Sequence, residues 1–271
     1  MLSFEKHERK NFGFSIQRLK LSILGYIQKI SFLKSNGIIF LSKYASHTVI
    51  QDLKLINKPT CIIPHGIDKR FYIKRKKLIK DFNVNSKESF KIIYVSKVDM
   101  YKHHWHVAEA VSKIRKKGFN ISLEIIGGSY KPALKKLKKK LINIKDSETF
   151  IKYVGEVPYD QLHNHYIDKD LIIFASSCEN LPIILLEGMA TALPIISSNL
   201  GPMPEVLKDN AYYFNPYDVE SIEEALYKIL ICEADRVKFA TNLVIDSENY
   251  SWDKTSKNTF EFINLILNKN K

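Results

Sequence analysis

Two glutamates with seven residues between them stand in the segment SSCENLPIILLEGMATALPIISSNLGPMPEV (176–206). Before the second glutamate, Asn180 followed by Pro182 has the side chains of a helix cap and a first helical turn. The free N–H groups and positive dipole end of such a helix form a site for phosphate. Glu179 stands just before that end, and Glu187 lies about two turns inside, on the order of 10 Å along the axis.

A carboxylate on either side of a phosphate site suits a particular class of ligand. Carboxylates accept two hydroxyl hydrogen bonds well, so Glu179 and Glu187 match the sugar and the ribose of a sugar nucleotide. The alternative is structural: Glu179 as a loop residue and Glu187 as a partly buried helix residue with a local partner. The strand–turn–helix setting, and the second loop at Gly201, Pro202 and Pro204, favour the functional interpretation.

The elements that must position this segment follow from the pattern of apolar residues. Strand patterns alternate with helical periodicity, which predicts an α/β fold with a doubly wound, parallel, six-stranded sheet. In such sheets ligands bind beyond the carboxyl ends of the strands, near the point where the strand order reverses. The strand patterns are 90–96, 121–127, 149–155, 171–177, 193–197 and 211–214, and the helical stretches between the first five are 103–117, 131–142, 159–168 and 181–192.

The first 64 residues have a separate pattern of two helices and two strands. Two strands do not complete an α/β domain, so they predict part of a second one. Its open edge would need to be covered or paired with another chain, because an exposed edge favours aggregation. The predicted elements are helices at about 15–34 and 43–54 and strands at 37–42 and 60–64; a final amphipathic helix is predicted in the tail, 251–271.

Composition narrows the function classes. Apolar residues make up 45% and charged residues 26% of the 271, which is typical of globular domains. No apolar run reaches the length of a membrane span. The net charge of +13 could reflect solvated lysines, a nucleic-acid partner or an anionic membrane surface. The densest basic run, 131–145, has its leucines at helical spacing and its lysines on the other face, as in a solvated helix. No recognition motif supports sequence-specific nucleic-acid binding, whereas contact with an anionic membrane stays open.

The cysteines and the start of the chain indicate a compartment. Cys61, Cys178 and Cys232 are widely spaced, which predicts buried thiols in a reducing environment rather than disulfides or a zinc site. The first residues have no apolar signal core. We therefore expect a cytoplasmic protein, with peripheral attachment to the inner face of the membrane as the open alternative.

No metal or cofactor is expected. Asp168 and Asp170 enclose a lysine in a D-x-D pattern, but they stand at the entry of a strand, the wrong end for ligands. His103, His104 and His106 lack acidic or cysteine partners at ligand spacing and are interpreted, like His163 and His165, as surface or loop residues. For His65 in PHGID, a role in stabilising a turn and a role in contacting substrate are both open.

The segment with the two glutamates resembles the E-x7-E signature of retaining family-4 glycosyltransferases, which have the two-domain GT-B fold. Glu179 and Glu187 would be its two acids. The likeness runs from about Asn36 to Trp252 and includes, in the same succession, IIPHGID (62–68) as the hinge, YVSKVDMYKHHWHVAEAV (94–111), LEIIGG (123–128), YVGEVPYDQL (153–162) and SSNLGPMPEV (197–206).

The resemblance implies roles by position. Lys97 and Lys102 correspond to the two cations that grip the donor diphosphate. Lys97 stands where the family commonly has arginine, so it keeps the charge without the bidentate fork. Backbone groups of Asn180 and Leu181 would complete the phosphate site.

Three further roles are implied at the ends of the donor. Glu179 would be the catalytic residue that contacts the transferred sugar, and Glu187 would bind the ribose hydroxyls. The loop from Gly155 to Val157 would border the base.

The implied function is transfer of a sugar, with retention and without metal, from a nucleoside diphosphate sugar to a glycan or lipid-linked glycan in cell-surface polysaccharide synthesis. The implied division is a truncated acceptor domain (1–64), a Rossmann-like donor domain (65–250) and a helix returning toward the N-terminal part (251–271). The family's acceptor domain has a Gly-rich loop that residues 1–64 lack. This predicts either a partner chain that completes that domain or, alternatively, an inactive or split fragment that only binds nucleotide sugars.

Overall fold

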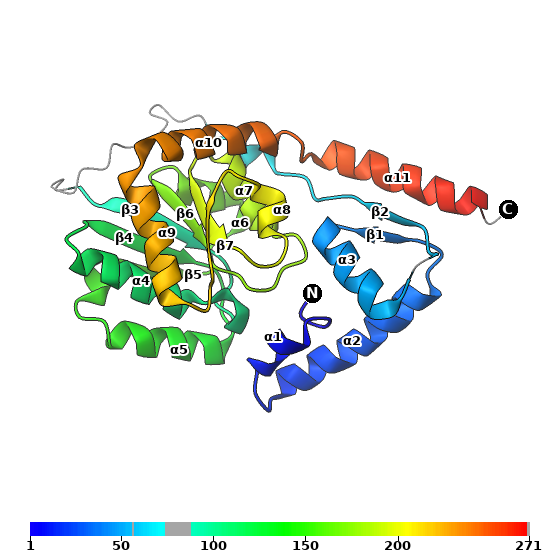
Figure 1. Cartoon of the computed structure of the whole chain (residues 1–271), viewed down its shortest axis with the longest axis horizontal. Helices are drawn as coiled ribbons and strands as arrows, with labels where there is room; N and C mark the ends of the chain where they lie inside the picture. Colours follow the sequence, from blue (N-terminus) through cyan, green and yellow to red (C-terminus); the bar gives the residue numbers. More distant parts are fainter. Residues whose placement is uncertain (56, 74–87, 270–271) are drawn as a thin grey trace.

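Six parallel strands form the main sheet of the protein (Figure 1). The computed structural model describes residues 1–55, 57–73 and 88–269. The strand order is β5-β4-β3-β6-β7-β8, which reverses direction between β3 and β6. These strands are β3 (Phe90–Val95), β4 (Ile121–Ile126), β5 (Ile151–Gly155), β6 (Leu171–Phe174), β7 (Ile195–Ser198) and β8 (Tyr212–Phe214).

The central strands are continuous apolar runs because helices cover both faces of the sheet. Every residue of β6 and of β7 is buried. Helix α4 packs against α5 and α9, and helix α7 packs against α10 (Figure 1). The helices are α4 (His104–Lys116), α5 (Lys131–Ile142), α6 (Tyr159–Leu162), α7 (Ile183–Ala190), α8 (Met203–Leu207), α9 (Val219–Ile231) and α10 (Glu233–Ser247).

The candidate site lies where the strand order reverses, between the loops that follow β3 and β6, a region that we call the crevice. The chain leaves β3 toward β4 and leaves β6 toward β7, so the loops after β3 and β6 separate in opposite directions. A crevice at the carboxyl ends of these two strands is the usual ligand site of such sheets. The predicted fold class is thereby confirmed, and the loops to inspect are those that follow Val95 and Phe174.

A smaller α/β part precedes this sheet. It contains a two-stranded parallel sheet with its own core, in which Phe40 and Val49 are buried. The side chains of Ser15 and Ser42 cap its two longer helices. Its elements are α1 (Lys6–Lys10), α2 (Ile16–Lys34), β1 (Ile38–Phe40), α3 (Lys43–Leu53) and β2 (Thr60–Ile62).

The last helix, α11 (Trp252–Lys269), lies beside β2 in Figure 1. Its Thr255 hydroxyl donates to the carbonyl oxygen of Pro64 at 2.8 Å. A Cβ on Gly37, just before β1, would meet the Ile266 side chain of α11 at 2.8 Å. Asn270 and Lys271, the end of the predicted tail, lie outside the described residues.

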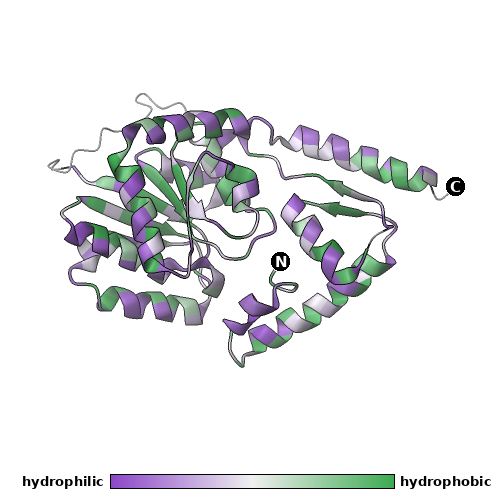
Figure 2. Ribbon diagram, in the orientation of Figure 1, coloured by the Kyte–Doolittle hydropathy of each residue, from purple (hydrophilic) through white to green (hydrophobic). Residues whose placement is uncertain are grey.

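Hydrophobic and hydrophilic residues alternate along α2 (Figure 2), and an apolar face of this helix is exposed. Ile16, Leu19, Ile23 and Ile27 are each more than half exposed and follow helical spacing. Within the described ranges, no helix combines the length and apolarity that a bilayer crossing requires.

Two predictions were wrong in part, one on the helix at 159–168 and one on the burial of the cysteines. The stretch 159–168 is the short helix α6 followed by a 3-10 turn, His163–Tyr166, rather than one helix. Its apolar side chains Leu162 and Tyr166 still point into the core. Of the three cysteines, only Cys178 is buried; Cys61 and Cys232 are partly exposed, and all three are free thiols.

Candidate functional site

The loops after β3 and β6 are fastened to each other across the crevice. The Ser177 N–H donates to the carbonyl oxygen of Tyr101 at 2.9 Å. The Ser177 hydroxyl lies 2.9 Å from Nε2 of His103. These bonds join residues that are 74 positions apart in sequence, and both loops contain predicted site residues.

Lys102 and Glu179 form an ion pair at this junction. The Lys102 side chain is 8% exposed and that of Glu179 14%, so the pair is largely removed from water. Lys102 Nζ also lies 4.9 Å from the ring centre of Phe174. Opposite charges attract more strongly where water is excluded. The structure therefore brings the predicted phosphate-binding cation and the predicted catalytic carboxylate into direct contact.

Lys97 lies on the same loop as Lys102 but is open to solvent. Its side chain is 57% exposed, and its Nζ lies 3.4 Å from a carboxylate oxygen of Asp99. The backbone beneath it is closely packed, because a Cβ on Gly127 would lie 2.3 Å from the carbonyl oxygen of Ser96. Gly127 has φ +141°, a conformation open to glycine. The end of β4 therefore fixes the place from which Lys97 extends.

The helix after Glu179 begins later than predicted. Asn180 does not cap it; α7 starts at Ile183, with Pro182 as the N-cap residue. The physical reason is Pro182, because a residue that precedes proline, here Leu181, is disfavoured in helical conformation. The Asn180 carbonyl oxygen instead accepts a hydrogen bond of 2.6 Å from the hydroxyl of Ser42. Asn180 thus connects the crevice to the smaller α/β part.

The N–H groups at this turn remain candidates for anion binding. Those of Asn180 and Leu181 donate to no other group in the described part of the chain. They directly follow Glu179 and stand at the positive end of α7. The predicted backbone contribution is therefore compatible with the observed turn, although the helix starts two residues further on.

Glu187 points inward from α7 and is fully buried. The Tyr159 hydroxyl donates to its Oε1 at 2.5 Å. Its Oε2 is a buried atom with no hydrogen-bond partner in the described structure. Burial raises the pKa of Glu187 to about 7, and the bond from Tyr159 opposes this rise only in part. A buried carboxylate oxygen without a donor is costly, so the site is suited to receive hydroxyl donors.

The loop after β5 reaches the same region. Gly155 has φ +90° and ends the strand, and Val157 packs partly against the core. Tyr159 follows two residues later and brings this loop into hydrogen-bond contact with Glu187. Tyr159 belongs to the motif YVGEVPYDQL (153–162), but the sequence analysis did not predict it as a site residue. Its position two residues after Val157 could have indicated that it lies near the site.

Further contacts at this edge join the small α/β part to the large sheet. The Glu205 carboxylate of α8 accepts bonds from the N–H groups of Lys43 and Tyr44, at 2.8 and 2.9 Å. A carboxylate at the amino end of α3 is favoured by the helix dipole. Neither Glu205 nor Ser42 was predicted, because each acts on a residue more than a hundred positions away.

The interpretation of the histidines as surface or loop residues was wrong for His104, which is 0% exposed and begins α4; His103 lies in the loop after β3 but is only 2% exposed. The His104 ring stacks on that of Tyr94 at 4.3 Å. Burial lowers the pKa of both histidines, that of His103 to about 3. His65 packs near Trp252, with ring centres 5.6 Å apart, and burial lowers its pKa.

The two aspartates of the D-x-D pattern, Asp168 and Asp170, both contact lysines. Asp168 binds Lys91 and Lys169, at 2.9 and 2.6 Å, at the amino-terminal edge of the sheet. Asp170 accepts a bond from the N–H of Lys91. Across the described ranges no group of histidine, cysteine and acidic side chains is arranged to hold a metal ion.

Comparison with known proteins identifies the family. The family profile described as "Glycosyl transferases group 1" matches residues 75–243. This is more than half of the chain, and the chain belongs to that family. Among curated relatives, an O-antigen chain mannosyltransferase B of Escherichia coli is 25% identical over 119 residues, which are 44% of this chain and 31% of that protein. An uncharacterized glycosyltransferase of Methanocaldococcus jannaschii is 26% identical over 248 residues, covering 84% of this chain and 62% of that one.

Solved structures share the fold, which is that of GT-B glycosyltransferases. Sucrose-phosphate synthase from Thermosynechococcus elongatus superposes with a TM-score of 0.73 at 17% identity, over 96% of this chain and 66% of that chain. HepE of Anabaena, solved with UDP and glucose, superposes with a TM-score of 0.74 at 14% identity, over 93% and 67%. The chain thus spans between about a third and two thirds of the length of these relatives.

Proposed function

We propose that this protein binds a nucleoside diphosphate sugar at the carboxyl edge of its large sheet and transfers the sugar with retention. The observation that carries the proposal is the meeting of Lys102 and Glu179 where the strand order reverses. Lys97 and Lys102 would bind the diphosphate, with the N–H groups of Asn180 and Leu181. Members of the same family act on sugars, and HepE was solved with UDP and glucose, which supports this ligand class.

The chemistry would be electrostatic and would use no metal. As the bond from sugar to diphosphate breaks, negative charge grows on the departing phosphate. Lysines fixed beside it stabilise the transition state more than the ground state, which lowers the barrier. Glu179 would hold hydroxyls of the transferred sugar, and Glu187 those of the ribose, with Gly155–Val157 at the base.

The test is a binding and product experiment. Calorimetric titration with UDP, GDP and ADP, and with their glucose or mannose derivatives, is expected to show one preferred base. Lys102→Ala should weaken that binding at least tenfold, whereas Lys116→Ala, an exposed lysine of α4, should not. The anomeric configuration of a product, measured by NMR, tests retention. Equal and weak binding of all the nucleotides would contradict the proposal.

The acceptor would be a glycan or lipid-linked glycan of cell-surface polysaccharide synthesis, as the similarity to an O-antigen mannosyltransferase supports. The second candidate is a module that binds sugar nucleotides without turnover. It is favoured by the two-stranded sheet of the small α/β part, since two strands alone are marginally stable. Binding without release of nucleoside diphosphate, in the presence of acceptor, would distinguish the second candidate from the first.

The exposed face of α2 would receive a partner chain that completes the small α/β part. About a third of the length of the superposed structures lies outside the part they share with this chain. An anionic membrane is the competing occupant, because residues 9–34 contain basic but no acidic side chains. Flotation with vesicles of phosphatidylcholine and of phosphatidylglycerol tests this alternative. Binding to the anionic vesicles, lost in Leu19→Ser with Ile23→Ser, would favour a peripheral protein at the inner face of the membrane.

A further inference from the structure

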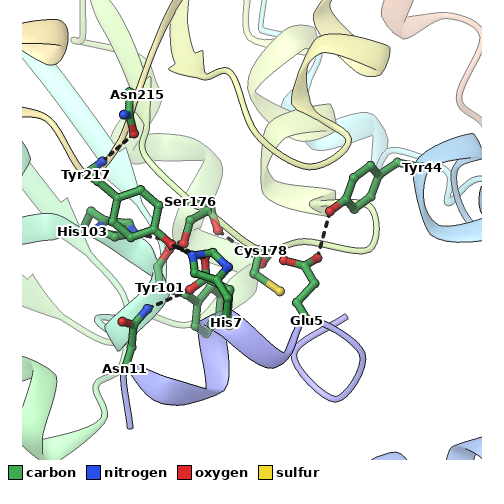
Figure 3. A network of polar contacts seen from close by, with 12 residues as sticks. Glu5, His7, Asn11, Tyr44, Tyr101, His103, Ser176, Cys178, Asn215 and Tyr217 are labelled. Atoms are coloured by element: carbon green, nitrogen blue, oxygen red, sulfur yellow. Dashed lines mark hydrogen bonds and ion pairs between the residues drawn. The ribbon is translucent and has the colours of Figure 1, made fainter. Parts of the chain in front are cut away.

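The N-terminal segment, Met1–Phe12, lies against the loops of the large sheet. Figure 3 shows α1 beside Tyr217, His103 and Cys178, which come from three different loops. The Tyr217 hydroxyl lies 3.0 Å from Nε2 of His7, a residue 210 positions away in sequence. The proposed catalytic mechanism uses none of these contacts, which makes their arrangement worth explaining.

Glu8 is the anchor of this segment. It is fully buried, and its carboxylate accepts hydrogen bonds from the Tyr217 hydroxyl and from the amide of Asn11, the latter at 2.9 Å. A buried carboxylate is costly unless donors surround it, so movement of Tyr217 away from Glu8 would leave Oε1 of Glu8 without this hydroxyl donor. The position of the Tyr217 side chain is therefore strongly constrained.

Tyr217 in turn contacts the residue next to Lys102. Its ring packs edge-on against His103, with ring centres 4.5 Å apart and planes at 72°. His103 holds a left-handed backbone conformation with φ +50°, which is uncommon for a residue with a side chain. Its Nε2 is bonded to Ser177, two residues before Glu179. One tyrosine thus supports the junction that brings Lys102 and Glu179 together.

A second contact of the N-terminal segment is made by Glu5, next to Glu179. The Glu5 carboxylate accepts a bond of 3.1 Å from the hydroxyl of Tyr44 and lies beside the thiol of Cys178 (Figure 3). Cys178 directly precedes Glu179. Glu5, at Cys178, and Glu8, through Tyr217 and His103 at Ser177, are therefore both connected to the residues just before the proposed catalytic carboxylate.

We propose that Tyr217, held by Glu8, is a positioning residue of the diphosphate site, so that the N-terminal segment forms part of that site. This inference rests on the proposed function. It means that the segment Glu5–Asn11 holds in place the two loops from which Lys102 and Glu179 extend, while the two side chains can still separate; neither Tyr217 nor Glu8 needs to touch the ligand.

The experiment compares a nucleoside diphosphate with the monophosphate of the same base, the base being the one that wild type binds best among UDP, GDP and ADP. Tyr217→Ala is expected to weaken diphosphate binding about tenfold, because a small displacement of binding groups has a large effect. Monophosphate binding should change less than twofold. Tyr217→Phe, which keeps the ring and removes the hydroxyl, should give an intermediate loss and serves if the alanine variant does not fold.

The matched control is Tyr227→Ala. Tyr227 is 40% exposed, close to the 38% of Tyr217, but it packs on Phe119 away from the crevice. It should leave the ratio of the two affinities unchanged. Equal weakening of both nucleotides by Tyr217→Ala, or no weakening, would overturn the positioning role and indicate a structural one.

Hydrogen exchange separates this inference from the proposed function. Amides of residues 97–103 and 176–180 should exchange faster in Tyr217→Ala than in wild type, with no ligand present. Unchanged exchange would refute the positioning role even if wild type binds nucleotides. Absence of nucleotide binding by wild type would instead refute the proposed function, and with it the role at a diphosphate site.

Discussion

Glu179→Gln should strengthen binding of the free nucleoside diphosphate. In the structure Lys102 is paired with Glu179, both being at most 14% exposed, so a diphosphate must compete with that carboxylate for the lysine. At an effective dielectric constant of about 20, two unit charges about 4 Å apart interact by about 4 kcal/mol. Much of this is offset by desolvation, so about 1.4 kcal/mol, or tenfold in affinity, is the expected gain.

The same substitution should have the opposite effect on the sugar. If Glu179 holds sugar hydroxyls once the diphosphate has taken Lys102, the nucleotide sugar gains about 1.5–3 kcal/mol from hydrogen bonds to a charged group. Glu179→Gln removes most of that gain. The variant should therefore bind the diphosphate more tightly than wild type and distinguish poorly between the diphosphate and its sugar derivative.

Isothermal titration calorimetry of both ligands with both proteins measures the four affinities. Glu220→Gln is the control, since this glutamate also pairs with a lysine but is 73% exposed on α9. It should change neither affinity. Weaker diphosphate binding in Glu179→Gln, or an unchanged difference between the two ligands, would refute the reasoning.

Four other outcomes are expected. Burial raises the pKa of Glu187 from 4.5 to about 7, so the folded protein favours the protonated form. The free energy of unfolding should therefore fall by about 3 kcal/mol as pH rises across that interval. Glu187→Gln should abolish this pH dependence, which urea titrations would measure. Nucleotide binding by wild type should strengthen from pH 6 to 8, because hydroxyl donors need the carboxylate, and a flat profile would exclude Glu187 as the ribose ligand. Gly127→Ala should lower the free energy of unfolding by about 1–3 kcal/mol and weaken diphosphate binding, because the new Cβ would displace the backbone of Ser96 and Lys97. A variant as stable as wild type would contradict this close packing. Chelation of divalent metals should change nucleotide affinity less than twofold, as thermal shifts with and without EDTA would measure, and a large loss would contradict a metal-free site.

The fold was readable from the sequence because buried parallel strands are continuous apolar runs. LIIF (171–174) and IISS (195–198) are fully buried strands and were placed within a few residues. The start of α7 was misplaced because Asn180 has the side chain of a cap. Pro182 disfavours a helical conformation at Leu181, so the helix begins at Ile183.

The site was readable only in part, since motifs place residues along the chain and do not reveal long-range partners. Lys102 and Glu179 were both selected, but nothing local indicates that they form an ion pair in the absence of ligand. The buried state of His104 depends on the ring of Tyr94 below it. The hydrogen bond from Tyr217 to Glu8 joins residues 209 positions apart. No periodicity in the sequence predicts such a contact.

The central claim is that one diphosphate is held by Lys97, Lys102 and the N–H groups after Glu179. A crystal structure of the protein with its preferred nucleoside diphosphate sugar tests it most directly. We predict phosphate oxygens within hydrogen-bond distance of both lysines, the Lys102–Glu179 pair separated, and the ribose at Glu187. A ligand bound elsewhere, with Lys102 still paired to Glu179, would contradict the account.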